Sequence, residues 1–166
     1  TVIQLGTWMP GFMQQAIAAP SGLGRAKETN VVTKTVNGIR RRRMGNTDIE
    51  VSELALGTQR WGGADFNSPD EALCFEMLDR GVLGAGLNLI DTAEQYPIPS
   101  SLTKPEGRTE EIIGRWLAKD KTRRDKVVLA SKITGGRNVN AQNIIADCER
   151  SLRRLGTDYM DIYTLH

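Results

Sequence analysis

The sequence predicts an α/β fold with a parallel sheet. Short apolar runs of strand length alternate with longer segments that carry an apolar stripe at helical spacing, and most of the connections between them are short. In addition, polar side chains follow the ends of the strands, which meet at one edge of a parallel sheet. These features predict four strands and three intervening helices between Leu54 and His166.

Residues 1–37 are expected to form a leader outside this fold. Apolar residues recur at helical spacing between Trp8 and Ile17, which predicts one amphipathic helix. Residues 25–35 have the composition of an extended linker. The leader is either a targeting or docking segment or a tail that folds only incidentally, and the sequence does not decide between them.

The distribution of charge bears on the role of this leader. Residues 1–43 contain seven Lys or Arg residues and one acidic residue, Glu28, whereas the rest of the chain is mildly acidic. A basic leader on an acidic body indicates an organellar transit peptide, for a plastid or a mitochondrion, or a docking arm. Without such a signal the expected location is cytoplasmic.

Residues 38–51 predict a β-hairpin that precedes the α/β elements. Residues 45–47 supply the turn, and Ile49 and Val51 alternate toward one face. The arginines at 40–43 then lie on one strand of a solvated ribbon. A nucleic-acid-binding patch is the disfavoured alternative, because no aromatic residues are interleaved with the arginines.

The first strand of the α/β region is expected at residues 54–57. Ser68 can cap the helix that follows, with Pro69 in its first turn and Glu71 completing a capping box. The buried stripe of this helix is expected at Ala72, Phe75, Leu78 and Val82. Residues 84–90 predict the second strand.

A long, proline-rich loop follows at residues 97–107. In compact domains a loop of this length is usually functional. The second helix is expected at 109–119 and the third strand at 127–130. The apolar face of this helix contains Ile112, Ile113, Trp116 and Leu117.

The third helix has the clearest end signals in the chain. Asn140 is its expected N-cap, and Gly156 is its expected C-cap. Its apolar face contains Ile144, Ile145, Cys148, Leu152 and Leu155. The fourth strand is expected at 160–163.

Four polar residues are expected just past the strand ends, namely Asp91, Tyr96, Lys132 and His166. A phenol is a weak acid, so a tyrosine that donates a proton needs a cationic neighbour to stabilise the phenolate. Lys132 can supply that charge, and Asp91 can pair with the lysine. The single histidine can donate to a substrate oxygen or relay a proton, according to its tautomer.

Other chemistry-bearing residues are assigned plainer roles. Asp161, within the fourth strand, is expected to be structural and paired. Trp61 either lines a substrate pocket or is an ordinary packed aromatic residue. Cys74 and Cys148 lie far apart and are expected to be reduced core residues, not a disulfide or a metal site.

Several motifs occur together in the order that the aldo-keto reductase family shows. The matching segments are Leu56-Gly57-Thr58, Asn88 to Pro97, Thr109-Glu110 with Gly114-Arg115-Trp116-Leu117, Ser131-Lys132, and Ser151 to His166. The chain resembles this family over roughly residues 38–166. The run Tyr96-Pro97-Ile98-Pro99 and the long loop after it most resemble the Tas-like branch.

This resemblance implies a fold and a set of roles. The expected fold is the first half of a (β/α)8 TIM barrel, strands 1–4, with an N-terminal hairpin that closes its lower end and an unmatched leader. It implies Tyr96 as proton donor, supported by Asp91, Lys132 and His166. It further implies Gly57, Thr58 and Asp91 as contacts of NADP(H), and a small-molecule carbonyl compound as substrate.

Two functions are compatible with these expectations. The first is an NADP-dependent oxidoreductase that reduces aldehydes or ketones as part of a longer chain, the 166 residues alone being inactive. The second is a catalytically silent half-barrel that serves as an accessory subunit, with protein partners covering its open edges and ordering residues 1–37. The sequence predicts no nucleic-acid partner, no metal site and no transmembrane segment, because no apolar run approaches the ~20 residues that span a bilayer.

Overall fold

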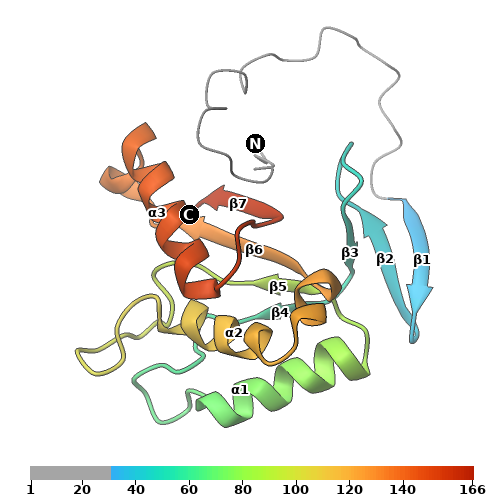
Figure 1. Cartoon of the computed structure of the whole chain (residues 1–166), viewed down its shortest axis with the longest axis horizontal. Coiled ribbons are helices and arrows are strands. Elements are labelled where there is room, and N and C mark those ends of the chain that lie inside the picture. The colour runs from blue at the N-terminus through green and yellow to red at the C-terminus, as the bar shows by residue number, and fades with distance from the viewer. Residues whose placement is uncertain (1–30) are drawn as a thin grey trace, which may run out of the picture.

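The computed structural model describes residues 31–166. The amphipathic helix and most of the basic leader expected from the sequence lie outside the described residues. The centre of the fold is a four-stranded parallel sheet in the order β4 (Ala55–Gly57), β5 (Leu89–Asp91), β6 (Val128–Ile133) and β7 (Ile162–Leu165). Figure 1 shows these strands stacked in sequence order, as βα alternation requires.

Three α-helices connect these strands, namely α1 (Glu71–Leu78), α2 (Arg108–Ala118) and α3 (Ala141–Leu155). A π-helical turn, η1 (Asp79–Gly84), extends α1, and the short 3-10 helices η2 (Lys121–Lys126) and η3 (Gly136–Asn138) precede β6 and α3. The helices pack on one face of the sheet, where Ile90, Leu129 and Trp116 are fully buried. Among the described residues, no helix is long and apolar enough to cross a membrane.

The other face of the sheet carries the alternate residues of the same strands. Leu89, Val128 and Ile162 pack there against Val51, in the last strand of an N-terminal antiparallel sheet, and against Ile49 just before that strand. Asn88, at the start of β5, fastens the two sheets, since its amide donates to the Glu50 carbonyl (2.8 Å) and accepts from the Ser52 N–H (2.7 Å). The small sheet therefore covers the lower end of this face, as expected of a barrel-closing hairpin.

This N-terminal sheet has one strand more than the sequence analysis expected. Its strands are β1 (Val32–Val36), β2 (Ile39–Arg43) and β3 (Glu50–Ser52), and β1 and β2 pair through Val36 and Ile39. The expectation of an unpaired linker up to residue 35 is therefore wrong for β1. Asn37 and Gly38 both have positive φ angles, of 49° and 83°, which is the geometry that a two-residue hairpin turn requires.

The start of α1 also differs from the expectation. Asp70, not Ser68, is the N-cap and accepts from the Leu73 N–H at 2.9 Å. Ser68 instead donates to Asp65 at 2.7 Å. With this start, Cys74 and Leu78 face the core, whereas Ala72 is exposed.

The strand boundaries also lie further toward the C-terminus than expected. The π-helical turn η1 takes up part of the segment expected as the second strand, so β5 begins only at Leu89. β6 extends to Ile133, which places Lys132 inside the strand and not beyond it. The caps of α3 are confirmed, because Asn140 accepts from the Asn143 N–H at 2.9 Å and Gly156 adopts a left-handed φ of 66°.

Candidate active site

Asp91 and Lys132 form the centre of the candidate site. Asp91 is the last residue of β5, and Lys132 lies near the end of the adjacent β6. The Lys132 ammonium lies 2.8 Å from Asp91 Oδ1 and donates to the Thr92 carbonyl at 2.7 Å. Only 17% of the lysine side chain is exposed, so its charge is held in place and partly shielded from water.

Tyr96 lies close to this ammonium. The Lys132 Nζ is 5.2 Å from the centre of the Tyr96 ring, and the tyrosine is 5% exposed. The Tyr96 carbonyl accepts from the N–H groups of Gly107 (2.9 Å) and Thr109 (3.4 Å), where α2 begins. The start of α2 thus holds the main chain of Tyr96 beside the charged pair.

The imidazole of His166 completes the group of four residues. Its ring centre lies 5.8 Å from that of Tyr96 in an edge-to-face arrangement. Its main-chain N–H donates to the Ile133 carbonyl at 3.2 Å, and its Nδ1 lies 3.0 Å from the side-chain amide nitrogen of Gln95. The structure therefore brings together Asp91, Tyr96, Lys132 and His166 at the C-terminal ends of β5, β6 and β7.

The other two tyrosines have different surroundings. Tyr163 is buried on β7, and burial raises the pKa of its phenol above the usual range. Tyr159 lies under the guanidinium of Arg124, 3.7 Å from the ring centre. Of the three tyrosines, Tyr96 is the one for which the structure gives contacts with both Lys132 and His166.

A buried ion pair supports the site from behind, and the sequence analysis missed it. Glu110 on α2 is fully buried; it accepts from Ser131 Oγ at 2.7 Å and pairs with Arg154 of α3 at 3.0 Å. Ser131 directly precedes Lys132 on β6, so the pair fixes α2 and α3 to the strand that carries the lysine. Helical spacing was the available signal, because Glu110 shares its face with Ile113 and Leu117.

Gly57 and Thr58 lie beside Asp91, where the resemblance placed cofactor contacts. Gly57 is in register with Asp91, and a Cβ built on it meets no atom within 4 Å, so there is open space next to the carboxylate. The N–H and hydroxyl groups of Thr58 both donate to the Asp91 carbonyl, at 3.1 and 2.9 Å. Thr58 thus fixes the end of β5, and Gly57 leaves the room that a planar ring would need.

Trp61 follows these residues and is 3% exposed. Its carbonyl accepts from Thr109 Oγ1 at 2.9 Å, which connects it to the start of α2. It also borders a shallow depression of about 430 Å³ that is lined as well by Gly57, Gln59, Arg60, Asn67, Pro69 and Met77. Trp61 is therefore a packed aromatic residue with one side toward a depression.

Within residues 31–166, no three His, Cys, Asp or Glu side chains are arranged to hold a metal ion.

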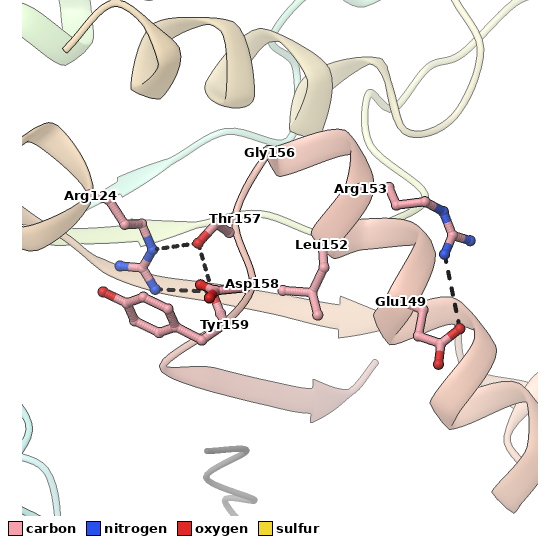
Figure 2. A pocket seen from close by; sticks show the side chains of 8 residues that line it. All are labelled: Arg124, Glu149, Leu152, Arg153, Gly156, Thr157, Asp158 and Tyr159. Atoms are coloured by element: carbon pink, nitrogen blue, oxygen red, sulfur yellow. Dashed lines mark hydrogen bonds and ion pairs between the residues drawn. The ribbon is translucent and has the colours of Figure 1, made fainter. Parts of the chain in front are cut away.

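A second hollow, of about 700 Å³, lies elsewhere and is shown in Figure 2. Its lining residues are Arg124, Glu149, Leu152, Arg153, Gly156, Thr157, Asp158 and Tyr159. Most of them come from the end of α3 and the segment before β7, so this hollow is at the opposite end of the strand from His166. The Arg124 guanidinium donates to Thr157 at 3.2 Å, as Figure 2 shows. It also donates to Asp161 at 2.8 Å, which confirms the paired, structural role expected for Asp161.

Comparison with known proteins agrees with this geometry. Two curated bacterial relatives are similar over most of the chain. Protein tas of Escherichia coli K12 is 40% identical over 135 residues, covering 75% of this chain and 37% of that protein. Aldo-keto reductase YhdN of Bacillus subtilis is 36% identical over 130 residues, covering 74% and 36%. The chain thus spans little more than a third of the length of these relatives.

The fold comparison points the same way. The crystal structure of a thermostable aldo-keto reductase, Tm1743, in complex with the inhibitor epalrestat aligns with a TM-score of 0.58 and 28% identity, covering 76% of this chain and 42% of that one. The parallel βα elements described here are accordingly the first half of a (β/α)8 barrel. The model of the Aldo/keto reductase family matches residues 53–166, from the approach to β4 through β7 to His166. By its sequence and its fold, the chain belongs to the aldo/keto reductase family.

Proposed function

We propose that the complete protein is an NADP(H)-dependent oxidoreductase that reduces aldehydes or ketones. The observation that carries the proposal is the position of the Lys132 ammonium, which contacts Asp91 at 2.8 Å and lies 5.2 Å from the Tyr96 ring. An ammonium held by a carboxylate close to a phenol stabilises the phenolate and makes the phenol a better proton donor.

The roles of the four residues follow from their contacts. A bound nicotinamide cofactor supplies the hydride. Tyr96 donates a proton to the carbonyl oxygen, which gains negative charge during the reaction, and the Lys132 charge compensates the phenolate that remains. Asp91 holds the lysine ammonium in place through its contact at 2.8 Å. His166 donates a hydrogen bond to the same oxygen and so orients the substrate.

Gly57, Thr58 and Asp91 would hold the reacting end of the cofactor. The open space over Gly57 favours this assignment, because a side chain there would occupy the room beside Asp91. The Asp91 side chain is 41% exposed and is available to a ribose hydroxyl. Trp61 would border the substrate side through the depression next to Gly57.

The proposal is tested by assaying the protein with NADPH and NADH against a series of aliphatic and aromatic aldehydes and ketones. We expect NADPH to be consumed with formation of the alcohol. Tyr96→Phe should lower kcat by at least about 100-fold while the Kd for NADPH is unchanged, since only the transferable proton is removed. Tyr159→Phe is the matched control. Equal turnover by the two variants would disprove the assignment of Tyr96.

The two edge strands of the sheet bear on a second candidate function, that of an accessory subunit. Leu54, before β4, and Leu165, on β7, are 61% and 64% exposed at opposite edges of the sheet. Such edges pair with more polypeptide, which the rest of a barrel or a partner subunit can supply. In this alternative the half-barrel is a silent subunit whose basic leader docks it or targets it to an organelle. Stable association with partners in sedimentation, together with no NADPH binding and no carbonyl reduction, would favour this function over the first.

A further inference from the structure

Gln95 is positioned to control the histidine of the site, and no motif drew attention to it. Its amide nitrogen lies 3.0 Å from His166 Nδ1, although the two residues are 71 positions apart in the sequence. In this orientation the Gln95 amide nitrogen is the donor, so the ring nitrogen that it meets accepts. The proton of the neutral ring is then on Nε2.

Both partners of this contact are held by their main chains. On either side of Gln95, the Glu94 N–H donates to the Lys132 carbonyl (3.2 Å) and the Tyr96 N–H donates to the Ala93 carbonyl (3.1 Å). The Glu94 carboxylate also accepts from the Thr134 N–H at 2.6 Å. The segment that carries Gln95 is therefore anchored to the strand that carries the lysine.

The histidine is restrained from three directions. Its N–H donates to the Ile133 carbonyl (3.2 Å), its ring packs edge-to-face on Tyr96, and its carbonyl closely approaches the position that a Cβ would occupy on Gly135. These contacts hold the main chain and one edge of the ring, while the side chain stays exposed. The proton of the neutral ring can then lie on either nitrogen. Gln95 is the side chain that contacts Nδ1, and this contact differs between the two tautomers of His166.

We propose that Gln95 is a positioning residue that holds His166 as the neutral tautomer protonated on Nε2. The consequence for catalysis rests on the proposed function: Nε2–H is then the donor that faces the carbonyl oxygen of the substrate. Because Gln95 is uncharged, it favours this tautomer without favouring the imidazolium. A glutamate at the same place would do the opposite, since its oxygens can only accept from Nδ1–H when ionised.

The tautomer can be observed directly, because His166 is the only histidine among residues 1–166 and its signals are identified by their loss in His166→Gln. Two-bond ¹H–¹⁵N spectra of the ¹⁵N-labelled complete protein should show an imidazole with the Nε2–H pattern that His166→Gln removes. Gln95→Met should convert this pattern to a mixture of tautomers, and Gln95→Glu should convert it to the imidazolium pattern. Gln142→Met, an exposed change on α3, should leave it unaltered. A wild-type Nδ1–H pattern, or an Nε2–H pattern that persists in Gln95→Met, would overturn the proposal.

Kinetics of the same variants separate this inference from the proposed function. In an active protein, Gln95→Met should lower kcat for aldehyde reduction by about tenfold without changing the Kd for NADPH, whereas Gln142→Met should have no effect. If Gln95→Met alters the spectrum while the wild type reduces no carbonyl compound, the proposed function fails and the tautomer assignment stands. If the wild type is active and Gln95→Met changes neither spectrum nor kcat, the inference fails and the proposed function stands.

Discussion

Lys132 and Asp91 are contributed by adjacent parallel strands, and the lysine ammonium lies 2.8 Å from the aspartate Oδ1. The pair is asymmetric: the lysine side chain is 17% exposed and the aspartate 41%. The ammonium is therefore the more desolvated of the two groups, and its contacts with Asp91 and the Thr92 carbonyl compensate for the lost hydration. A lysine held in this way is a fixed positive charge close to the Tyr96 ring.

The first prediction follows from that charge. Lys132→Met keeps the length of the side chain and removes the ammonium, so kcat for carbonyl reduction should fall by at least about 100-fold. Lys119→Met is the matched control, because Lys119 lies over Phe75 at the end of α2, outside the group of four residues. Steady-state kinetics with NADPH measure both variants. If the two retain the same activity, Lys132 does not support the proton donor.

The features that were predicted correctly from the sequence depend on residues close together in the chain, whereas the errors arose where more distant or competing contacts decide. The caps of α3 depend on Asn140 and Gly156 and their immediate neighbours, and both were predicted correctly. The start of α1 was wrong because Ser68 and Asp70 are both good caps, and the choice between them depends on a hydrogen bond to Asp65. Strand β1 was missed because the turn signal Asn37-Gly38 lies within a basic, polar segment.

The candidate site shows the same contrast. Asp91, Lys132 and His166 could be brought together from the sequence, because the ends of neighbouring parallel strands lie side by side. The contact of Gln95 with His166 could not, since it depends on side-chain directions across 71 positions. Glu110 was assigned only to a motif, and its burial depends on how closely α2 approaches α3.

The second prediction concerns the buried ion pair. Arg154→Met leaves the fully buried Glu110 carboxylate without its cation, and the expected loss of stability is about 3 kcal/mol. Arg153→Met, at the next position, removes only an exposed pair with Glu149 at 3.9 Å and should change stability by less than about 0.5 kcal/mol. Urea unfolding followed by circular dichroism compares them. Similar midpoints for both variants would show that the buried pair contributes no more than the exposed one.

The third prediction concerns Gly107, where the long loop joins α2. Its φ is 85°, and a Cβ at this position would collide with the Arg154 guanidinium. Gly136 has a similar φ of 71° but nothing within 4 Å, so Gly136→Ala measures the backbone strain alone, about 1 kcal/mol. Gly107→Ala should destabilise the fold by at least about 1 kcal/mol more, because the alanine also displaces the ion pair. Thermal unfolding of both variants tests this; equal shifts in Tm would contradict it.

The last prediction is a pH dependence that arises from the two cysteines. Both thiols are free, and burial raises the pKa of Cys74 to about 12 and that of Cys148 to about 11. In the unfolded chain a thiol ionises near pH ~8.5, so the unfolded state loses these protons first as the pH rises. The stabilising contribution is therefore complete below about pH 8.5 and decreases from there toward pH 11–12.

Comparison with thiol-free variants isolates this effect from other groups that titrate at high pH. Between pH 7.5 and 9.5, the wild type should lose roughly 1 kcal/mol per thiol more than a Cys74→Val, Cys148→Ala double variant does. The free energy of unfolding in urea, measured at both pH values, gives the difference. At pH 8 both thiols of the folded wild type should also resist modification by a disulfide reagent and react only on unfolding. A solvated thiol ionises at the same pH in the folded and the unfolded state. Rapid labelling of the folded wild type would therefore show that the thiols are not desolvated as the structure describes. The same conclusion would follow if the unfolding free energies of the wild type and the double variant changed equally with pH.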